Sequence, residues 1–156
     1  MSKKITIGNV CFIEDELNKK ILFLKRKNSP MQGMCTGVGG KTDFCEDIND
    51  SCVREVEEET GLKIRTPKLR GVIKTILDGY DSSWILFVYT ASDFDGNIIN
   101  CDEGELCWVD IDNIYSQNLI GFIRRILPAI LKDDGFLEGT IRHDLRGNVL
   151  EETLKR

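Results

Sequence analysis

The sequence has a single histidine, His143, and no two of its six cysteines stand in a Cys-x-x-Cys pair. A structural zinc site is therefore poorly supported. Long apolar runs are missing as well: the longest, residues 84–89, has six residues, whereas a helix that spans a bilayer needs about 20. We therefore expect no membrane partner. We also expect a cytoplasmic protein with reduced thiols, because disulfide frameworks are typical of small secreted chains.

A surplus of positive charge is also absent, since 21 Lys and Arg residues stand against 26 Asp and Glu residues and the net charge is -5. Surfaces that bind nucleic acids are basic, so we expect no stable nucleic-acid partner. The acidity is concentrated, because residues 43–59 hold eight acidic side chains and one arginine. A segment with this excess of negative charge needs a balancing positive charge.

The pattern of apolar residues predicts an α/β (α+β) fold. The length of 156 residues suits one domain over residues 1–156. Alternating apolar residues between turn residues predict strands, whereas apolar residues that recur every three or four positions predict helices. We expect a mixed sheet with two principal helices. The strands are expected at residues 5–14, 21–26, 69–77, 84–89, 106–109, 136–142 and 149–154, and the helices at 47–60 and 121–131.

The helix expected at residues 47–60 carries an acidic face. Glu55, Glu58 and Glu59 are spaced i, i+3 and i+4, so they lie on one side of the helix. Like charges at these spacings repel, and the helix dipole disfavours anions near the C-terminal end. A bound cation would explain the arrangement, and clustered carboxylates suit Mg²⁺ or Mn²⁺. From the carboxylates alone, a solvated charged helix face is the alternative.

The residues around this face match a known pattern. From Gly40 the chain reads glycine, five residues, Glu46, seven residues, and then Arg-Glu-Val-Glu-Glu-Glu-Thr-Gly-Leu over residues 54–62. This resembles the Nudix box, Gly-x5-Glu-x7-Arg-Glu-U-x-Glu-Glu-x-Gly-U with U aliphatic, at every position. The resemblance covers 23 of the 156 residues. It implies a Nudix-type α/β/α sandwich with a mixed β-sheet, a catalytic strand-loop-helix and a second helix in the C-terminal half.

The resemblance also implies roles for the charged residues of the box. In Nudix hydrolases the second and the last two glutamates bind divalent metal ions, so the expected metal ligands here are Glu55, Glu58 and Glu59. We take Glu55 and Glu58 as catalytic residues as well. The first glutamate and the arginine form a supporting ion pair that orients the helix, which assigns that role to Glu46 and Arg54.

The chemistry of the family follows from these ligands. Nudix enzymes hydrolyse a nucleoside diphosphate that is linked to another group, so a nucleotide substrate is the expected partner. The metal ions neutralise the diphosphate and lower the pKa of a bound water, and a carboxylate takes the proton. For a nucleoside triphosphate the products are the monophosphate and pyrophosphate. The glycine before the loop, here Gly39 or Gly40, often gives a backbone carbonyl to the metal, and we assign Gly40.

Two further stretches resemble the MutT-like branch that removes oxidised nucleotides. Residues 37–41, Gly-Val-Gly-Gly-Lys, are similar to the Gly-Phe-Gly-Gly-Lys of the animal 8-oxo-dGTPases, and residues 102–108 are similar to their Asp-Glu-x-x-x-Cys-Trp. The second stretch makes Glu103 the candidate fourth carboxylate, as metal ligand and catalytic base, ahead of Glu105. An acidic turn is the alternative. The expected substrate-binding residues are Gly39, Lys41, Thr36 and Lys25.

The residues that recognise the base in those enzymes match less well. Thr36 stands where they have asparagine, and their downstream Trp-Pro-Asp-Asp is absent. We therefore expect a nucleoside triphosphate hydrolase, with 8-oxo-dGTP as the substrate that the resemblance suggests. Dinucleoside polyphosphates, favoured by Tyr80 at 18 residues past the box, and ADP-ribose remain alternatives. A nucleotide-sensing module without catalysis is a remote one, and both a monomer and a homodimer fit the sequence.

Overall fold

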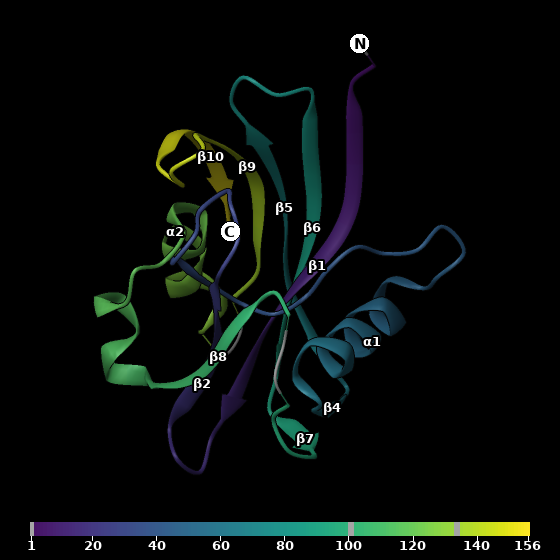
Figure 1. Cartoon of the computed structure of the whole chain (residues 1–156), viewed down its shortest axis with the longest axis vertical. Coiled ribbons are helices and arrows are strands. Elements are labelled where there is room, and N and C mark those ends of the chain that lie inside the picture. The colour runs from purple at the N-terminus through teal and green to yellow at the C-terminus, as the bar shows by residue number, and fades with distance from the viewer. Residues whose placement is uncertain (1, 100–101, 133–134) are drawn as a thin grey trace.

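The computed structural model describes residues 2–99, 102–132 and 135–156. Figure 1 shows the arrangement of its elements. The strands are β1 (Lys4–Asp15), β2 (Lys20–Arg26), β3 (Cys35–Thr36), β4 (Lys63–Arg65), β5 (Lys68–Leu77), β6 (Ser82–Ala91), β7 (Asp93–Asp95), β8 (Gly104–Asp110), β9 (Leu137–His143) and β10 (Val149–Lys155). The helices are α1 (Ile48–Thr60), the 3-10 helix η1 (Ile111–Ser116) and α2 (Gly121–Ile130).

Most strands belong to one mixed sheet. In the described residues its order is β10-β9-β5-β6-β1-β2-β3, with β8 paired to the other edge of β2. The pairs β1–β6 and β5–β9 are parallel, and the remaining pairs of this sheet are antiparallel. The short strands β4 and β7 pair separately. The expected mixed sheet is confirmed, and the last two strands, β9 and β10, pair as an antiparallel hairpin.

The two helices lie on opposite sides of the central strands, as Figure 1 shows. Alternation along β1 explains this placement, because successive side chains of a strand point to opposite faces. Val10 and Phe12 pack in the cluster that contains the apolar face of α2. Cys11 and Ile13 pack in a second cluster with α1. The layers are therefore helix, sheet and helix, which confirms the expected α/β/α sandwich.

Helix α1 begins and ends where the sequence predicts. Asp47 is the N-cap, and its side chain accepts a hydrogen bond of 3.0 Å from the backbone N–H of Asp50. Gly61 follows the last turn with φ of 82°, a left-handed conformation that glycine adopts without strain. Its N–H donates to the carbonyl of Glu57. The caps therefore fix the ends of the helix, and the packing of Cys52 and Val56 in the second cluster turns the face that carries them towards the sheet.

The cysteines add small apolar side chains to the core. Cys11, Cys35, Cys45, Cys52 and Cys107 are free thiols, and the first two are buried together with Cys52. Cys101 lies outside the described residues. A buried free cysteine behaves as a small hydrophobe. In the part of the chain that the structure describes, no helix has the length and apolar character needed to cross a membrane.

Candidate functional site

The glycine-rich loop before α1 runs alongside β1. Backbone hydrogen bonds join Asn9 N–H to the carbonyl of Gly40 at 2.8 Å and Cys11 N–H to the carbonyl of Val38 at 2.6 Å. A side chain at Gly39 would overlap the backbone carbonyl of Asn9, and its φ of 154° is uncommon for other residues. The glycines therefore let the loop lie directly on the strand, between the sheet and the helix.

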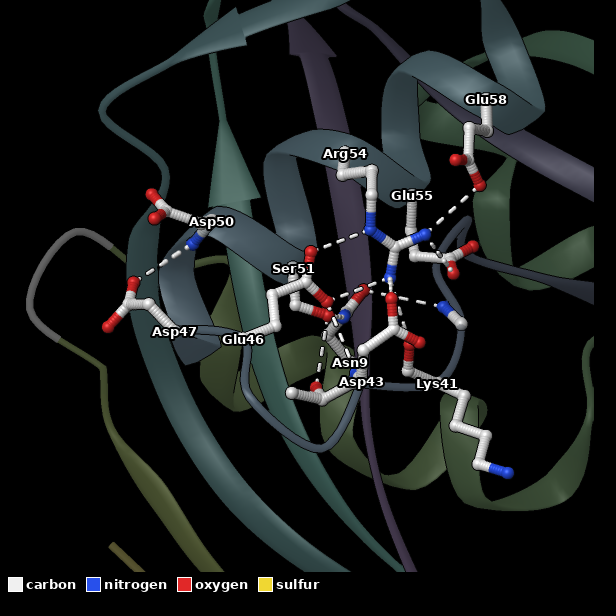
Figure 2. A network of polar contacts seen from close by, with 12 residues as sticks. Asn9, Lys41, Asp43, Glu46, Asp47, Asp50, Ser51, Arg54, Glu55 and Glu58 are labelled. Carbon is white, nitrogen blue, oxygen red and sulfur yellow. Dashed lines mark hydrogen bonds and ion pairs between the residues drawn. The ribbon is translucent and has the colours of Figure 1, made fainter.

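A buried polar network ties this loop to the helix, and sequence reasoning missed it. Asn9 is 3% exposed, and its side-chain amide donates to the hydroxyl of Ser51, which is fully buried, at 2.9 Å. Thr42 donates to the same hydroxyl at 3.0 Å, and Asn9 Oδ1 accepts from Gly40 N–H at 3.4 Å. Figure 2 shows Asn9 and Ser51 at the base of the site. The sequence signal that could have found them is a polar residue among apolar ones, Asn9 in a strand and Ser51 in a helix.

Arg54 joins most of the acidic residues of the box (Figure 2). Its Nε and Nη2 donate to the two carboxylate oxygens of Glu46 at 2.6 and 2.9 Å, which is the bidentate geometry expected for a strong pair. Its Nη1 donates to Glu55 at 2.9 Å and to Glu58 at 3.1 Å. Its Nη2 also reaches the backbone carbonyl of Lys41 at 3.2 Å. The ion pair between Glu46 and Arg54 is therefore present, and it clamps the loop onto the helix.

This pair should make the stability of the fold depend on pH. The hydrogen bond from Arg54 lowers the pKa of Glu46 to about 2. Because the charged form is favoured in the folded state, the pair stabilises the fold above the ordinary glutamate pKa of about 4.3, and this contribution is lost as the pH falls through the lowered pKa. We expect Glu46→Gln to be less stable than the wild type at pH 7, with the difference shrinking as the pH falls from 5 towards about 2.

Urea unfolding of both proteins at a series of pH values measures this difference. Comparing Glu46→Gln with the wild type at the same pH removes the effect of the other carboxylates, which both proteins share. A difference in unfolding free energy that stays constant from pH 7 to pH 3 would contradict the assignment.

The three glutamates of the acidic face differ in their environment. Glu59 is 7% exposed, the side chain of Glu55 is 17% exposed and that of Glu58 is 60% exposed. The N–H of Gly39 donates to Glu59 at 2.6 Å. Burial, followed by a hydrogen bond with Glu103, raises the pKa of Glu59 to about 8. Burial also raises the pKa of Glu55, against the lowering effect of Arg54.

The hydrogen bond between Glu59 and Glu103 has a structural consequence. Glu103 lies in the turn before β8, far from the box in the sequence, and it reaches the most buried glutamate of the box. Two charged carboxylates in contact repel each other, so this contact adds to burial in raising the pKa of Glu59. Glu103, which the sequence resemblance suggested as a fourth carboxylate, therefore lies within the acidic cluster.

The donor set fits a hard divalent cation, because every candidate group is an oxygen. Among the described residues, no three Asp, Glu, His or Cys side chains already converge in an arrangement that could hold a metal ion. The reason is visible in the contacts: Arg54 holds Glu55 and Glu58, whereas Glu59 pairs with Glu103. Each of Glu55 and Glu58 bonds to the guanidinium through one oxygen, so this pairing leaves the second carboxylate oxygen of each for a cation.

A cavity of about 580 Å³ opens beside the cluster. Of the residues expected from the sequence, those that line it are Glu55, Glu59, Glu103, Gly39, Gly40, Lys41 and Thr36. Glu58 lies outside this lining, on the exposed side of α1. Lys25 is also placed elsewhere, because alternate residues of β2 face opposite sides: Leu24 and Arg26 line the cavity, whereas Lys25 is exposed to solvent.

Comparison with known proteins agrees with this geometry. The family model described as the NUDIX domain matches residues 4–130. The chain belongs to the Nudix family. It is therefore a hydrolase of the kind that acts on pyrophosphate bonds, in a family that generally uses divalent metals such as Mg²⁺ and binds nucleotide substrates.

Similar proteins include both uncharacterised and named hydrolases. The Nudix hydrolase YvcI of Bacillus subtilis, described as uncharacterised, is 33% identical over 132 residues, which is 82% of each chain. The ADP-ribose pyrophosphatase of Methanocaldococcus jannaschii is 42% identical over 57 residues, 36% of this chain and 34% of that one. The oxidized purine nucleoside triphosphate hydrolase of Danio rerio is 31% identical over 99 residues, 63% of this chain and 64% of that one.

Among solved structures, the MutT protein of Bacillus halodurans superposes with a TM-score of 0.86 at 26% identity. The match covers 96% of this chain and 97% of that one. The Nudix fold of the chain is therefore shown by structure as well as by sequence.

Gly40 offers a test of how tightly the Nudix site is packed. A Cβ at this position would overlap the carboxylate of Glu55, while the backbone lies outside the left-handed region. We expect Gly40→Ala to fold normally but to displace the Glu55 carboxylate, with a loss of hydrolysis of roughly a hundredfold, the effect of a misplacement near 1 Å. Steady-state kinetics and thermal unfolding measure the two effects.

Gly39→Ala is the matched comparison. There the added Cβ would overlap the backbone of Asn9, which cannot rotate away, so this variant should lose stability as well as activity. If Gly40→Ala retains wild-type activity, the Glu55 carboxylate does not need its observed position.

Proposed function

We propose that the chain is a Mg²⁺-dependent hydrolase of nucleoside triphosphates that releases the monophosphate and pyrophosphate, with oxidised purine nucleotides such as 8-oxo-dGTP among its substrates. The observation that carries this proposal is the lining of the cavity. The acidic cluster and the glycine-rich loop line it together with large apolar side chains that include Trp84, Leu86 and Phe122. A triphosphate suits the charged and glycine-rich part of this lining, and a base suits the apolar side chains.

In this proposal the acidic residues divide the work. Glu55, Glu58, Glu59 and Glu103 would hold Mg²⁺, with Mn²⁺ as a substitute, together with the carbonyl of Gly40. The bound ion supplies charge neutralisation at the diphosphate and a water of lowered pKa. Glu103 accepts the proton of the attacking water, since it lines the cavity and contacts Glu59. The ion pair of Glu46 and Arg54 holds the loop against α1.

The phosphates of the substrate lie along the loop in this proposal. Lys41 lines the cavity next to Gly39 and Gly40, so its ammonium group can pair with phosphate oxygens. Thr36 lines the same wall and offers a hydroxyl group to the substrate. Lys25 was expected to bind the substrate, but Arg26 lines the cavity and Lys25 does not. We therefore assign the phosphate contact to Arg26.

The similarity to the Danio rerio protein supports oxidised purine nucleoside triphosphates as substrates. ADP-ribose is the second candidate, favoured by the shorter match to the archaeal ADP-ribose pyrophosphatase. The tyrosine that favoured dinucleoside polyphosphates gains no support, because Tyr80 is 54% exposed and is not among the residues that line the cavity. A sensor without catalysis is disfavoured because every carboxylate of the box is present.

A substrate panel tests the proposal. Purified protein is incubated with Mg²⁺, or with EDTA as control, and with 8-oxo-dGTP, dGTP, the common nucleoside triphosphates, diadenosine tetraphosphate and ADP-ribose. We expect the highest kcat/KM for a purine nucleoside triphosphate, with pyrophosphate and the monophosphate as products and no turnover in EDTA. Preference for ADP-ribose would overturn the substrate assignment while leaving the Nudix chemistry intact.

A further inference from the structure

One residue of the cavity wall comes from a segment outside the matched Nudix region. The hairpin β9–β10 follows residue 130, where the family match ends. Strand β9 adds to the sheet by parallel pairing with β5, which places its last residue, His143, opposite Leu77. Both residues line the cavity. The only histidine of the sequence therefore lies in the wall of the pocket.

The residue His143 is largely buried, and only one of its ring nitrogens, Nδ1, has a hydrogen-bond partner among the described residues. The residue is 6% exposed, and its Nδ1 lies 3.1 Å from the backbone carbonyl of Asp144. A carbonyl can only accept a hydrogen bond, so Nδ1 carries the proton and Nε2 of the neutral ring is an acceptor. Within residues 2–99, 102–132 and 135–156, no group pairs with Nε2. No fully buried side-chain nitrogen or oxygen of the described residues lacks a partner, so an unpaired Nε2 must be accessible to solvent, and the cavity that His143 lines is where a ligand or water can donate to it.

The surroundings hold this ring in one position. Phe122 packs against it with the ring centroids 6.1 Å apart. The backbone carbonyl of His143 accepts a hydrogen bond of 2.8 Å from Asp78 N–H. The carbonyl of Asp144, which orients the ring, also accepts from Gly147 N–H at 3.1 Å in the turn that follows. The carbonyl of Gly147 in turn accepts from Gly121 N–H at 3.0 Å, where α2 begins.

A flat aromatic surface lies in the same cavity. Trp84 of β6 covers Gly8 of β1 so closely that a Cβ at Gly8 would lie 2.6 Å from the indole ring. Trp84 and Phe122 thus offer apolar faces to a planar ligand, and such a ligand places its polar edge where a polar group can meet it. His143 lines the same cavity and contacts Phe122, so its Nε2 supplies an acceptor there.

From these contacts we infer that His143 is a specificity-determining residue, whose Nε2 accepts a hydrogen bond from an N–H donor of the nucleobase of the substrate. This inference rests on the proposed nucleotide substrate and adds the residue that reads the base. An N–H donor is present on guanine, on adenine and on 8-oxoguanine. Purine riboside has the same ring without such a donor, so it isolates the contact.

Binding of product-like ligands tests the inference without requiring turnover. Calorimetry with Mg²⁺ gives the dissociation constants of GMP, AMP, purine riboside 5′-monophosphate and ribose 5-phosphate. For the wild type, we expect GMP or AMP to bind roughly tenfold more tightly than purine riboside 5′-monophosphate, the effect of one hydrogen bond to a buried group. Equal affinity of the wild type for all three purine ligands would by itself overturn the inference.

Two variants separate recognition from a structural role. His143→Asn places an amide where Nδ1 was and keeps the contact with Asp144, but removes the acceptor at Nε2. His143→Gln places its amide near the position of Nε2. We expect His143→Asn to abolish the preference over purine riboside 5′-monophosphate while leaving the affinity for ribose 5-phosphate within about twofold, and His143→Gln to retain part of the preference.

Each remaining outcome has one meaning. If His143→Asn keeps the wild-type preference, or weakens ribose 5-phosphate as much as the nucleotides, His143 only supports the fold. Thermal unfolding of both variants checks that they are folded, and the wild-type comparison stands if one is not. If the substrate panel shows no triphosphate hydrolysis but these ratios hold, the proposed reaction fails and the base contact stands.

Discussion

Glu58→Gln should reduce kcat/KM by a factor on the order of 10³ while the fold survives, because Glu58 is a proposed metal ligand and its loss would weaken charge stabilisation worth several kcal/mol. The structure explains why these effects separate. The side chain of Glu58 is 60% exposed and bonds to Arg54 at 3.1 Å. An exposed ion pair of this kind contributes at most about 1 kcal/mol to stability. Steady-state kinetics over a range of Mg²⁺ concentrations and thermal unfolding measure both quantities.

Glu57→Gln is the control for this prediction. Glu57 is the neighbouring residue on α1, it is exposed, and it occupies the variable position of the box. The change removes the same charge, so we expect activity within about twofold of the wild type, as for an ordinary surface substitution. Near-wild-type activity of Glu58→Gln with Mg²⁺ would show that Glu58 is not a metal ligand. An equal loss of activity in both variants would show that the net charge of the helix, and not Glu58 in particular, causes the effect.

Much of the fold could be predicted because its signals are local. The apolar alternation of β1, the cap at Asp47 and the left-handed glycine at Gly61 all act within a few residues, and α1 begins within one residue of the expected position. The strands that were missed, β3, β4 and β7, have two or three residues each. Such segments are too short to show alternation, and they form because tertiary contacts place them next to a partner.

The site was predicted less completely, because its details depend on contacts between distant segments. The helical pattern placed Glu55, Glu58 and Glu59 on one face, yet the structure buries Glu59 and leaves Glu58 exposed. The burial comes from the loop packed on the helix, whose position depends on a strand some 30 residues earlier. His143 could not be assigned from the sequence, because it reaches the cavity through the parallel pairing of β9 with β5.

Glu59→Gln should have opposite effects on activity and on the stability of the metal-free protein. Glutamine resembles the protonated glutamate: its oxygen can accept from Gly39 N–H and its amide can donate to Glu103. In the wild type the pKa of Glu59 is raised to about 8, so folding opposes its ionisation, and stability falls as the pH rises from the ordinary glutamate pKa towards the raised one. Glutamine does not ionise, so Glu59→Gln does not lose stability in this way as the pH rises.

We therefore expect Glu59→Gln in EDTA to melt roughly 4–8 °C above the wild type at pH 8, the shift that about 2 kcal/mol causes in a chain of this size. At pH 5, where Glu59 is protonated in the folded wild type, the difference should be small, which provides an internal control. Activity should fall on the order of 10³-fold, and Mg²⁺ should no longer raise the melting temperature, since the variant cannot supply this carboxylate. A cluster of metal ligands without its cation becomes more stable when it loses a negative charge. Lower stability of Glu59→Gln than of the wild type at pH 8 would therefore contradict the assignment of Glu59 as a buried metal ligand. Stabilisation of the variant by Mg²⁺ as strong as that of the wild type would contradict it too.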